Sequence, residues 1–263
     1  MSLWGFVITA SLLCGIPSIS RAQTPLFGIC FFDQGYAGSL DEPGVNYQDL
    51  KRLSFGSQLT ATDPASGSTN SLQGAVSKGK LYGYAQASAG TEFQTSSYVG
   101  MDSYFFDTFY ITGPAGATGQ FTLNLTLNGT VTGTCVSSPQ GCQVDDLIDN
   151  FVVLENCTAN PAQCGSVVGL VQKNLGSPNH QSVEVTVSFP AGTSVVLGGL
   201  LQLRDLVQNE NPGGGGSLTF MGGKSTYQTG FFTFAPVTPG FMFTTASGLT
   251  YAAATQDALD DAE

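Results

Sequence analysis

The sequence predicts an all-β fold, an antiparallel β-sandwich or jelly roll with at most one or two short helices. Several segments alternate between apolar and polar residues, which places one face of each strand in a core and the other in solvent. Turn signals rich in glycine and proline separate these segments, and the chain contains 34 Gly and 12 Pro. Many short strands joined by such turns are typical of a sandwich.

Residues 1–22 are predicted to be a secretory signal peptide. An apolar run over residues 3–14 is too short to span a bilayer as a helix. Ser20 and Ala22 then place small residues before a cleavage site, which would make Gln23 the first mature residue. No Lys or Arg precedes the apolar run, and a buried first strand is the alternative.

The rest of the chain is expected to form one secreted domain. We predict a single β-sandwich over residues 23–252 and an acidic disordered tail over residues 253–263. The formal net charge is −11, with 8 Lys and Arg against 19 Asp and Glu. Such a surface is repelled by phosphates and anionic lipid, which argues against nucleic acid and membrane partners. No later apolar run approaches membrane length, so we expect no membrane association of the mature form.

The alternation is clearest in residues 121–128 and 182–189. The residues expected to point inward are Phe121, Leu123, Leu125, Leu127, Val183, Val185, Val187 and Phe189. Further strands are expected at 27–33, 54–61, 79–88, 103–112, 194–203, 216–221, 229–236 and 240–247. Residues 144–152 instead place apolar side chains at helical spacing, which favours a short helix that leads into a strand.

Four cysteines form two pairs with the same spacing. Cys135 and Cys142 enclose six residues, and so do Cys157 and Cys164, with a proline inside each loop. An oxidising compartment favours disulfides, and a turn in each loop would bring its flanking cysteines together. We therefore expect two local disulfides.

A crosswise pairing of the same four cysteines is the alternative, in the register of an antiparallel hairpin. It would place Pro139 and Pro161 inside paired strands, where each removes a hydrogen-bond donor. A zinc site with four thiolates is a further alternative, although its usual spacing is shorter. Cys30 is left over, either free or bonded to another chain.

No motif in the sequence specifies a reaction. His180 is the only histidine, and the sequence contains no nucleophile elbow, zinc-protease motif, phosphate loop or dinucleotide fingerprint. Asp107 and Glu184 lie in predicted strands and could form the carboxylate pair of a glycoside hydrolase. The alternatives are a structural, hydrogen-bonded Asp107, an outward-facing Glu184 and a solvated His180. We expect no enzyme activity.

Two groups of residues are candidates for binding. Tyr82 and Tyr84 share one face of a strand and could stack on sugar rings, with packing under a loop as the alternative. Asp145, Asp146 and Asp149 could offer carboxylate oxygens to calcium, with a solvated acidic segment as the alternative. No other cofactor is expected. Together with Asp107, the two tyrosines form the candidate ligand site.

Four segments share their strand and turn spacing with a known family: GKLYGYAQASAG, DTFYITGPAGATGQFTLNLTLNGTVTG, VTVSFPAGTSVVLGGLLQL and FMFTTASGLTY. Over about residues 75–251 the chain resembles the extracellular domains of bacterial PEP-CTERM proteins, which exosortase sorts. The resemblance implies an exported protein associated with biofilm or exopolysaccharide. The sequence ends in YAAATQDALDDAE, without the Pro-Glu-Pro motif, apolar helix and basic tail of that family.

We therefore expect a secreted, non-enzymatic β-sandwich protein of the cell surface or extracellular matrix. Its expected partners are extracellular polysaccharide or other matrix and surface proteins. A carbohydrate-binding module is the first alternative, and a glycan-active hydrolase or lyase is the second.

Overall fold

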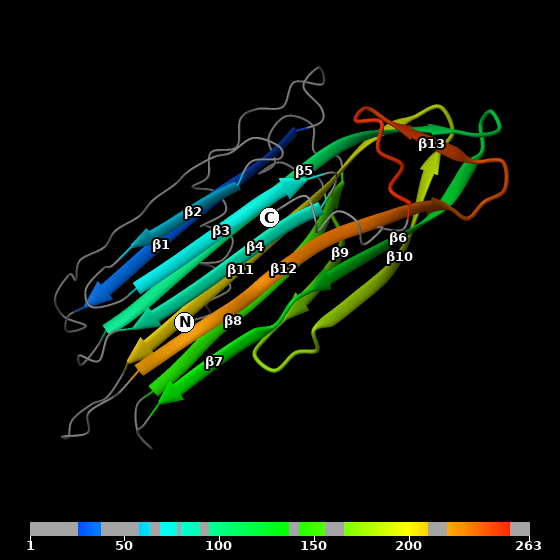
Figure 1. The fold of residues 1–263 in the computed structure, drawn as a ribbon. Coiled ribbons are helices and arrows are strands. Elements are labelled where there is room, and N and C mark those ends of the chain that lie inside the picture. The colour runs from blue at the N-terminus through cyan, green and yellow to red at the C-terminus, as the bar shows by residue number, and fades with distance from the viewer. Residues whose placement is uncertain are drawn as a thin grey trace.

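The computed structural model describes residues 26–37, 58–63, 69–77, 80–89, 95–136, 142–155, 166–209 and 220–252. All regular structure within these ranges is β-strand, and the strands form two antiparallel sheets (Figure 1). The predicted all-β sandwich class is therefore confirmed. None of the described segments is a helix that could span a membrane.

The first sheet, sheet A, has the strand order β1-β5-β11-β8-β9. Its strands are β1 (Leu26–Ala37), β5 (Thr95–Thr112), β11 (Ser194–Asn209), β8 (Cys142–Glu155) and β9 (Ser166–Lys173). A short strand, β13 (Met242–Thr245), pairs with the end of β5.

The second sheet, sheet B, has the strand order β10-β6-β12-β4-β3-β2. Its strands are β10 (His180–Pro190), β6 (Thr118–Asn128), β12 (Phe220–Pro236), β4 (Lys80–Ala89), β3 (Thr69–Ser77) and β2 (Gln58–Asp63). One further strand, β7 (Val131–Val136), pairs with β12.

Strands β6 and β7 are two halves of one interrupted strand. Both pair antiparallel with β12, so they run in the same direction. Gly129 lies between them with φ of 123°, a conformation that side chains other than glycine rarely adopt. Gly129 therefore lies at a break along one side of β12 and not in the turn of a hairpin. The break leaves backbone carbonyls for side chains to bind.

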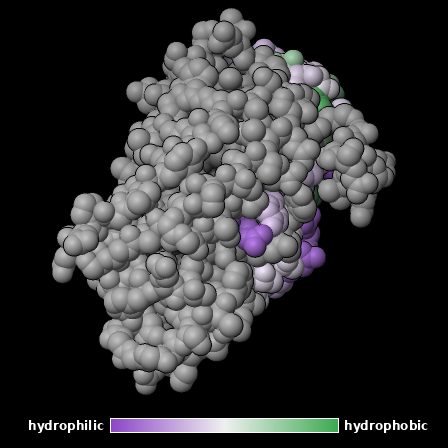
Figure 2. Space-filling view, turned by 60° about the vertical axis from the view of Figure 1, so that its left-hand side comes forward, coloured by the Kyte–Doolittle hydropathy of each residue, from purple (hydrophilic) through white to green (hydrophobic). Residues whose placement is uncertain are grey.

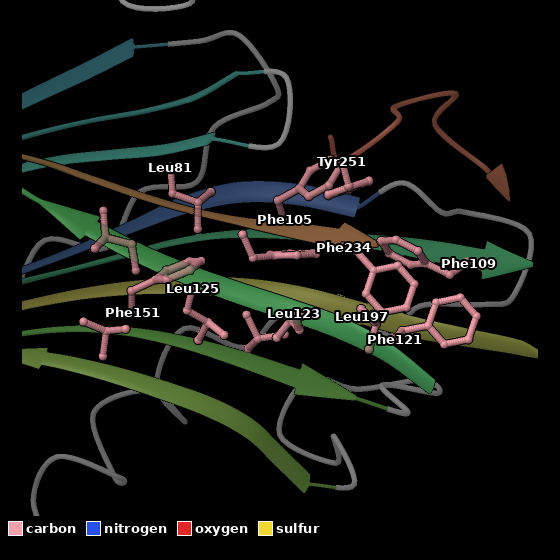
Figure 3. Close-up of a cluster of buried hydrophobic side chains, with 14 of the residues drawn as sticks. Leu81, Phe105, Phe109, Phe121, Leu123, Leu125, Phe151, Leu197, Phe234 and Tyr251 are labelled. Atoms are coloured by element: carbon pink, nitrogen blue, oxygen red, sulfur yellow. The ribbon is translucent and has the colours of Figure 1, made fainter. Parts of the chain in front are cut away.

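The predicted alternation of β6 and β10 is confirmed. The four inward residues of β6 are all fully buried (Figure 3). In β10, Phe189 is buried, and Val185 and Val187 pack against the core. Val183 is 38% exposed, because β10 is the edge strand of sheet B.

Aromatic rings from both sheets fill one end of the core. Phe121 of β6 and Phe234 of β12 stack with ring centroids 4.9 Å apart. Phe109 of β5 meets Phe234 edge-on at 5.1 Å, and this contact joins the two sheets (Figure 3). Such ring pairs add to the free energy gained from burying their area.

The helix expected over residues 144–152 is wrong, because these residues belong to β8. That strand pairs with β11 on one side and β9 on the other. Phe151 and Val153 point into the core, while Val152 is nearly buried on the opposite face. A strand that is covered on both faces loses its period of two, and its apolar residues can then imitate helical spacing.

Sheet A also buries apolar residues on its outer face. Tyr104 and Phe106 of β5 form a second cluster there, against which Leu154 and Leu200 pack. The Phe106 ring lies across Gly198 of β11, where an added Cβ would come within 1.9 Å of the ring. This close approach explains why glycine occupies the middle of a central strand.

Candidate functional site

Asp107 is a buried carboxylate on the inner face of β5. Its Oδ1 accepts hydrogen bonds from the backbone N–H of Thr108 at 2.8 Å and of Ser247 at 3.1 Å. Its Oδ2 accepts from the Ser247 hydroxyl and from the Tyr251 hydroxyl, the latter at 3.2 Å. Asp107 is thus a hydrogen-bonded structural carboxylate that holds the segment after β13.

Tyr251 connects that segment to sheet B. Its carbonyl accepts a hydrogen bond from the N–H of Phe234 at 2.9 Å, and its ring stacks on Phe232 at 4.9 Å. Burial, together with the negative charge of Asp107, raises the pKa of the Tyr251 hydroxyl far above its ordinary value. The residue has φ of 48°, in the left-handed region. The surrounding contacts therefore hold Tyr251 in an unfavourable backbone conformation.

Lys173 is a buried cation at the break between β6 and β7. Its Nζ donates hydrogen bonds to the carbonyl of Gly129 at 2.5 Å and to the carbonyl of Asn179. Asp149, which is also fully buried, is its register partner across the β8–β9 pair. Burial lowers the pKa of the Lys173 ammonium, and the negative charge of Asp149 opposes that shift.

Further hydrogen bonds surround this cation. The N–H of Gly129 donates to the backbone carbonyl of Asn179 and to its side-chain Oδ1, both at 2.9 Å. Gln228 of β12 donates from Nε2 to the carbonyl of Thr130 at 3.0 Å. We call this group the polar junction: Gly129, Thr130, Asp149, Lys173, Asn179 and Gln228. It spans both sheets, and within it Oε1 of Gln228 is buried without a hydrogen-bond partner.

The outer face of sheet B carries polar side chains, some of them exposed and others half-buried or buried. Its side chains come from the alternate positions of β10, β6 and β12, and the strand register places them in rows. One row contains Glu184, Asn124 and Thr233, and the next contains Ser182, Thr126 and Phe231. Where described residues reach the surface in Figure 2, hydrophilic and near-neutral residues predominate.

A third row ends at the single histidine. The pairs His180–Asn128 and Asn128–Thr229 are directly opposite in the register, and Nδ1 of His180 lies 2.7 Å from Oδ1 of Asn128. His180 begins β10 and is exposed, which confirms a solvated position for it. Amide, hydroxyl, carboxylate and imidazole groups on these rows supply both donors and acceptors.

The candidate tyrosines lie at the β4 side of this face. Tyr82 is opposite Thr229, so it shares the outer face with Tyr84, but it is only 7% exposed. Tyr84 is half-buried, and its hydroxyl donates to Oε1 of Gln86 at 2.5 Å. The common face was predicted from the period of two, and the burial of Tyr82 agrees with the packing that the sequence offered as the alternative. It leaves little of the Tyr82 ring for stacking on a sugar.

Phe231 is the aromatic residue of this face that sequence reasoning missed. It is half-buried, and Nζ of Lys80 lies 5.7 Å from its ring centroid. The register places Lys80 and Phe231 directly opposite each other on β4 and β12. The alternation in FFTF could have placed Phe231 outward, because Phe232 and Phe234 are strongly buried.

The structure does not bring the candidate carboxylates together. Asp107 points inward from sheet A, and Glu184 is exposed on the outer face of sheet B. An acid and base pair of a glycoside hydrolase must flank one bond from an open site. Asp107 is likewise on a different sheet face from Tyr82 and Tyr84, so these three residues do not share one surface.

The acidic group near the first cysteine pair lies in β8. Asp149 belongs to the polar junction, and the side chains of Asp145 and Asp146 are outside the described part. No cluster of three or more His, Cys, Asp or Glu that could hold a metal occurs in the described ranges. Calcium binding stays a prediction.

The cysteine predictions fall largely outside the described residues. Cys135 lies in β7 of sheet B and Cys142 in β8 of sheet A, with only their backbone placed. Cys157 and Cys164 are not described, and neither are the predicted signal peptide and acidic tail. The disulfide pairing stays a prediction.

Comparisons with known proteins add no family to these observations. No family model matches the chain, and no curated protein matches its sequence.

Proposed function

We propose that the protein is a secreted, non-enzymatic protein of the cell surface or extracellular matrix that binds polysaccharide through the outer face of sheet B. The observation that carries this proposal is the alignment of Glu184, Asn124 and Thr233 beside the His180–Asn128 pair on a rigid antiparallel sheet. Glu184 and His180 are exposed, and the side chains of Asn124, Asn128 and Thr233 beside them on three adjacent strands are half-buried. Sugar hydroxyls both donate and accept hydrogen bonds, so a mixture of donors and acceptors suits them.

Within the described residues, two buried polar groups are consistent with this assignment. Asp107 is saturated with donors, and Lys173 is bound to two backbone carbonyls. Each of these groups joins two parts of the fold, so neither is an accessible catalytic group. The chemistry that remains on the outer face of sheet B suits reversible hydrogen bonding rather than bond cleavage.

The charge of the chain narrows the class of polysaccharide. A formal net charge of −11 repels polymers that carry carboxylate or sulfate groups. Glu184 is an exposed anion on the face, whereas Lys80 is 9% exposed and lies beside Phe231. We therefore expect neutral polysaccharides to bind more tightly than anionic ones.

Binding of the full mature chain to an array of neutral and anionic glycans tests the proposal. Selective binding to neutral polymers is expected, and Asn124→Ala should weaken it by about tenfold, the effect of roughly one lost hydrogen bond to a ligand. Gln172→Ala is the matched control, because Gln172 is an exposed amide on sheet A.

Two results would contradict the proposal. One is an array without any selective binding, which would favour a purely structural role in contact with other matrix proteins. The other is equal loss of affinity in Asn124→Ala and Gln172→Ala, which would show that the outer face of sheet B has no special part in binding.

A further inference from the structure

The polar junction contains one acceptor and one donor that its described hydrogen bonds leave open. Oε1 of Gln228 is buried without a hydrogen-bond partner. Nζ of Lys173 carries three N–H groups, and its hydrogen bonds to the carbonyls of Gly129 and Asn179 use two of them. A buried polar atom without a partner destabilises a fold, so proteins usually satisfy such an atom with an ordered water or an ion.

The open acceptor and the open donor are held at neighbouring peptide units. Nζ of Lys173 donates to the carbonyl of Gly129 at 2.5 Å, and Nε2 of Gln228 donates to the carbonyl of the next residue, Thr130, at 3.0 Å. Lys173 belongs to β9 of sheet A, and Gln228 belongs to β12 of sheet B. Both groups therefore lie in the same part of the space between the two sheets.

This part of the interior is closed to solvent. Asp149, Lys173 and Gln228 are each 0% exposed. Two residues after Gln228, Gly230 packs against the ring of Phe151, where an added Cβ would come within 2.6 Å of the ring. A ligand held in the polar junction would therefore exchange slowly with the bulk solvent.

The open groups select a small neutral ligand. It must donate a hydrogen bond to Oε1 of Gln228 and accept one from Nζ of Lys173. A metal cation cannot accept that bond and would be repelled by the ammonium of Lys173. Water can form both bonds, and buried waters in proteins typically make about three hydrogen bonds to such groups.

We propose that the polar junction binds one water molecule, which bridges Lys173 of β9 and Gln228 of β12. The second hydrogen of this water is available to the carboxylate of Asp149, the register partner of Lys173. The water joins sheet A to sheet B at the break between β6 and β7. The proposal concerns the interior of the sandwich and does not depend on polysaccharide binding at the outer face of sheet B.

A crystal structure of the full mature chain that resolves ordered solvent tests the bridge. One water is expected within about 2.7–3.2 Å of both Nζ of Lys173 and Oε1 of Gln228. A direct hydrogen bond between the two side chains would overturn the proposal. A metal ion at this position would overturn it as well, and so would a junction without a water where other buried waters are resolved.

Nuclear Overhauser spectra between water and the protein give a second test in solution. A cross-peak from a long-lived water to the side-chain amide of Gln228 is expected. The amide of Gln172 is the internal control, since it is exposed and should show no such water. A spectrum without the Gln228 cross-peak would count against the bridge.

A matched pair of variants identifies the acceptor. Gln228→Met removes Oε1, so its crystal structure should lack the water, whereas Gln172→Met should keep it. A Gln228→Met protein that retains the water in the same place would contradict the assignment. If Gln228→Met fails to fold, the structure and spectra of the unmodified protein decide the question.

Discussion

The Asp107 site and the polar junction both bury charge between the two sheets, but they compensate it differently. Asp107 is surrounded by neutral donors, three of which come from Ser247 and Tyr251. In the polar junction Asp149 lies beside a cation, and that cation is itself bound by two carbonyls at a strand break. One site is a carboxylate held by hydrogen bonds, and the other is a pair of opposite charges.

The difference predicts how each site fails. Removal of one neutral donor from Asp107 takes away one hydrogen bond and leaves others in place. Removal of Lys173 takes the nearby positive charge away from the buried Asp149. The loss of stability from breaking such a pair is much larger than the stability that the intact pair contributes. The polar junction should therefore be more sensitive to a single substitution than the Asp107 site.

The largest effect is expected for Lys173→Met. The substitution keeps the length of the side chain but removes the cation beside the buried Asp149, which should lower the free energy of unfolding by about 3–5 kcal/mol. Urea unfolding measures the loss. The double variant Lys173→Met/Asp149→Leu should recover at least about half of it, because no charge then stays buried. A single variant that loses less than about 1 kcal/mol would show that the pair is not buried as described.

A smaller effect is expected for Ser247→Ala. Asp107 loses the hydroxyl donor of Ser247 but keeps the N–H donors and the Tyr251 hydroxyl. The expected loss is about 1.5–3 kcal/mol, the range for a hydrogen bond to a charged group. Ser188→Ala is the control, since Ser188 is exposed on β10 and should change stability by no more than about 0.5 kcal/mol. Equal effects of the two substitutions would contradict the role of Asp107.

The smallest effects are expected in the pH dependence of the free energy of unfolding, where Tyr251 and Lys173 should contribute opposite slopes at alkaline pH. The pKa of Tyr251 is raised in the folded state. Its contribution to the free energy of unfolding is therefore complete below the ordinary pKa of 10.0 and is lost at higher pH, where the tyrosine of the unfolded chain ionises. The pKa of Lys173 is lowered, so the unfolded chain binds more protons and stability rises toward pH 10.5. Urea unfolding across this range should show that Tyr251→Phe weakens the fall and that Lys173→Met weakens the rise. Profiles that run parallel to that of the unmodified protein would contradict both assignments.

The alternating strands were predictable because each has one buried and one exposed face. The period of two in β6 and β10 needs no knowledge of neighbouring strands, and Phe121 and Phe189 lie where it places them. The prediction failed in β8, where β9 and β11 pair on both sides and apolar residues occupy both faces. The sequence pattern within one strand cannot show that residues from elsewhere in the chain bury both of its faces.

The sites were less predictable for a related reason. Asp107 was recognised as a strand carboxylate with a structural alternative, but its partners lie 140 and 144 residues away. Lys173 carries no local signal at all, since a lysine at the end of a strand is usually solvated. Only the meeting of β9 with the break after Gly129 makes it a buried cation. Long-range packing, which the sequence does not encode locally, decides which charges are structural.

The central claim is that Asp107 and the Lys173–Asp149 pair have structural roles, whereas the outer face of sheet B is our proposed ligand-binding surface. Measurement of both unfolding and glycan binding in Asp107→Asn and Glu184→Gln tests it most directly. The account predicts that Asp107→Asn loses stability and, while still folded, binds as the unmodified protein does. Glu184→Gln should keep its stability and bind with altered affinity. A folded Asp107→Asn protein that no longer binds, beside a Glu184→Gln protein that binds normally, would contradict the account.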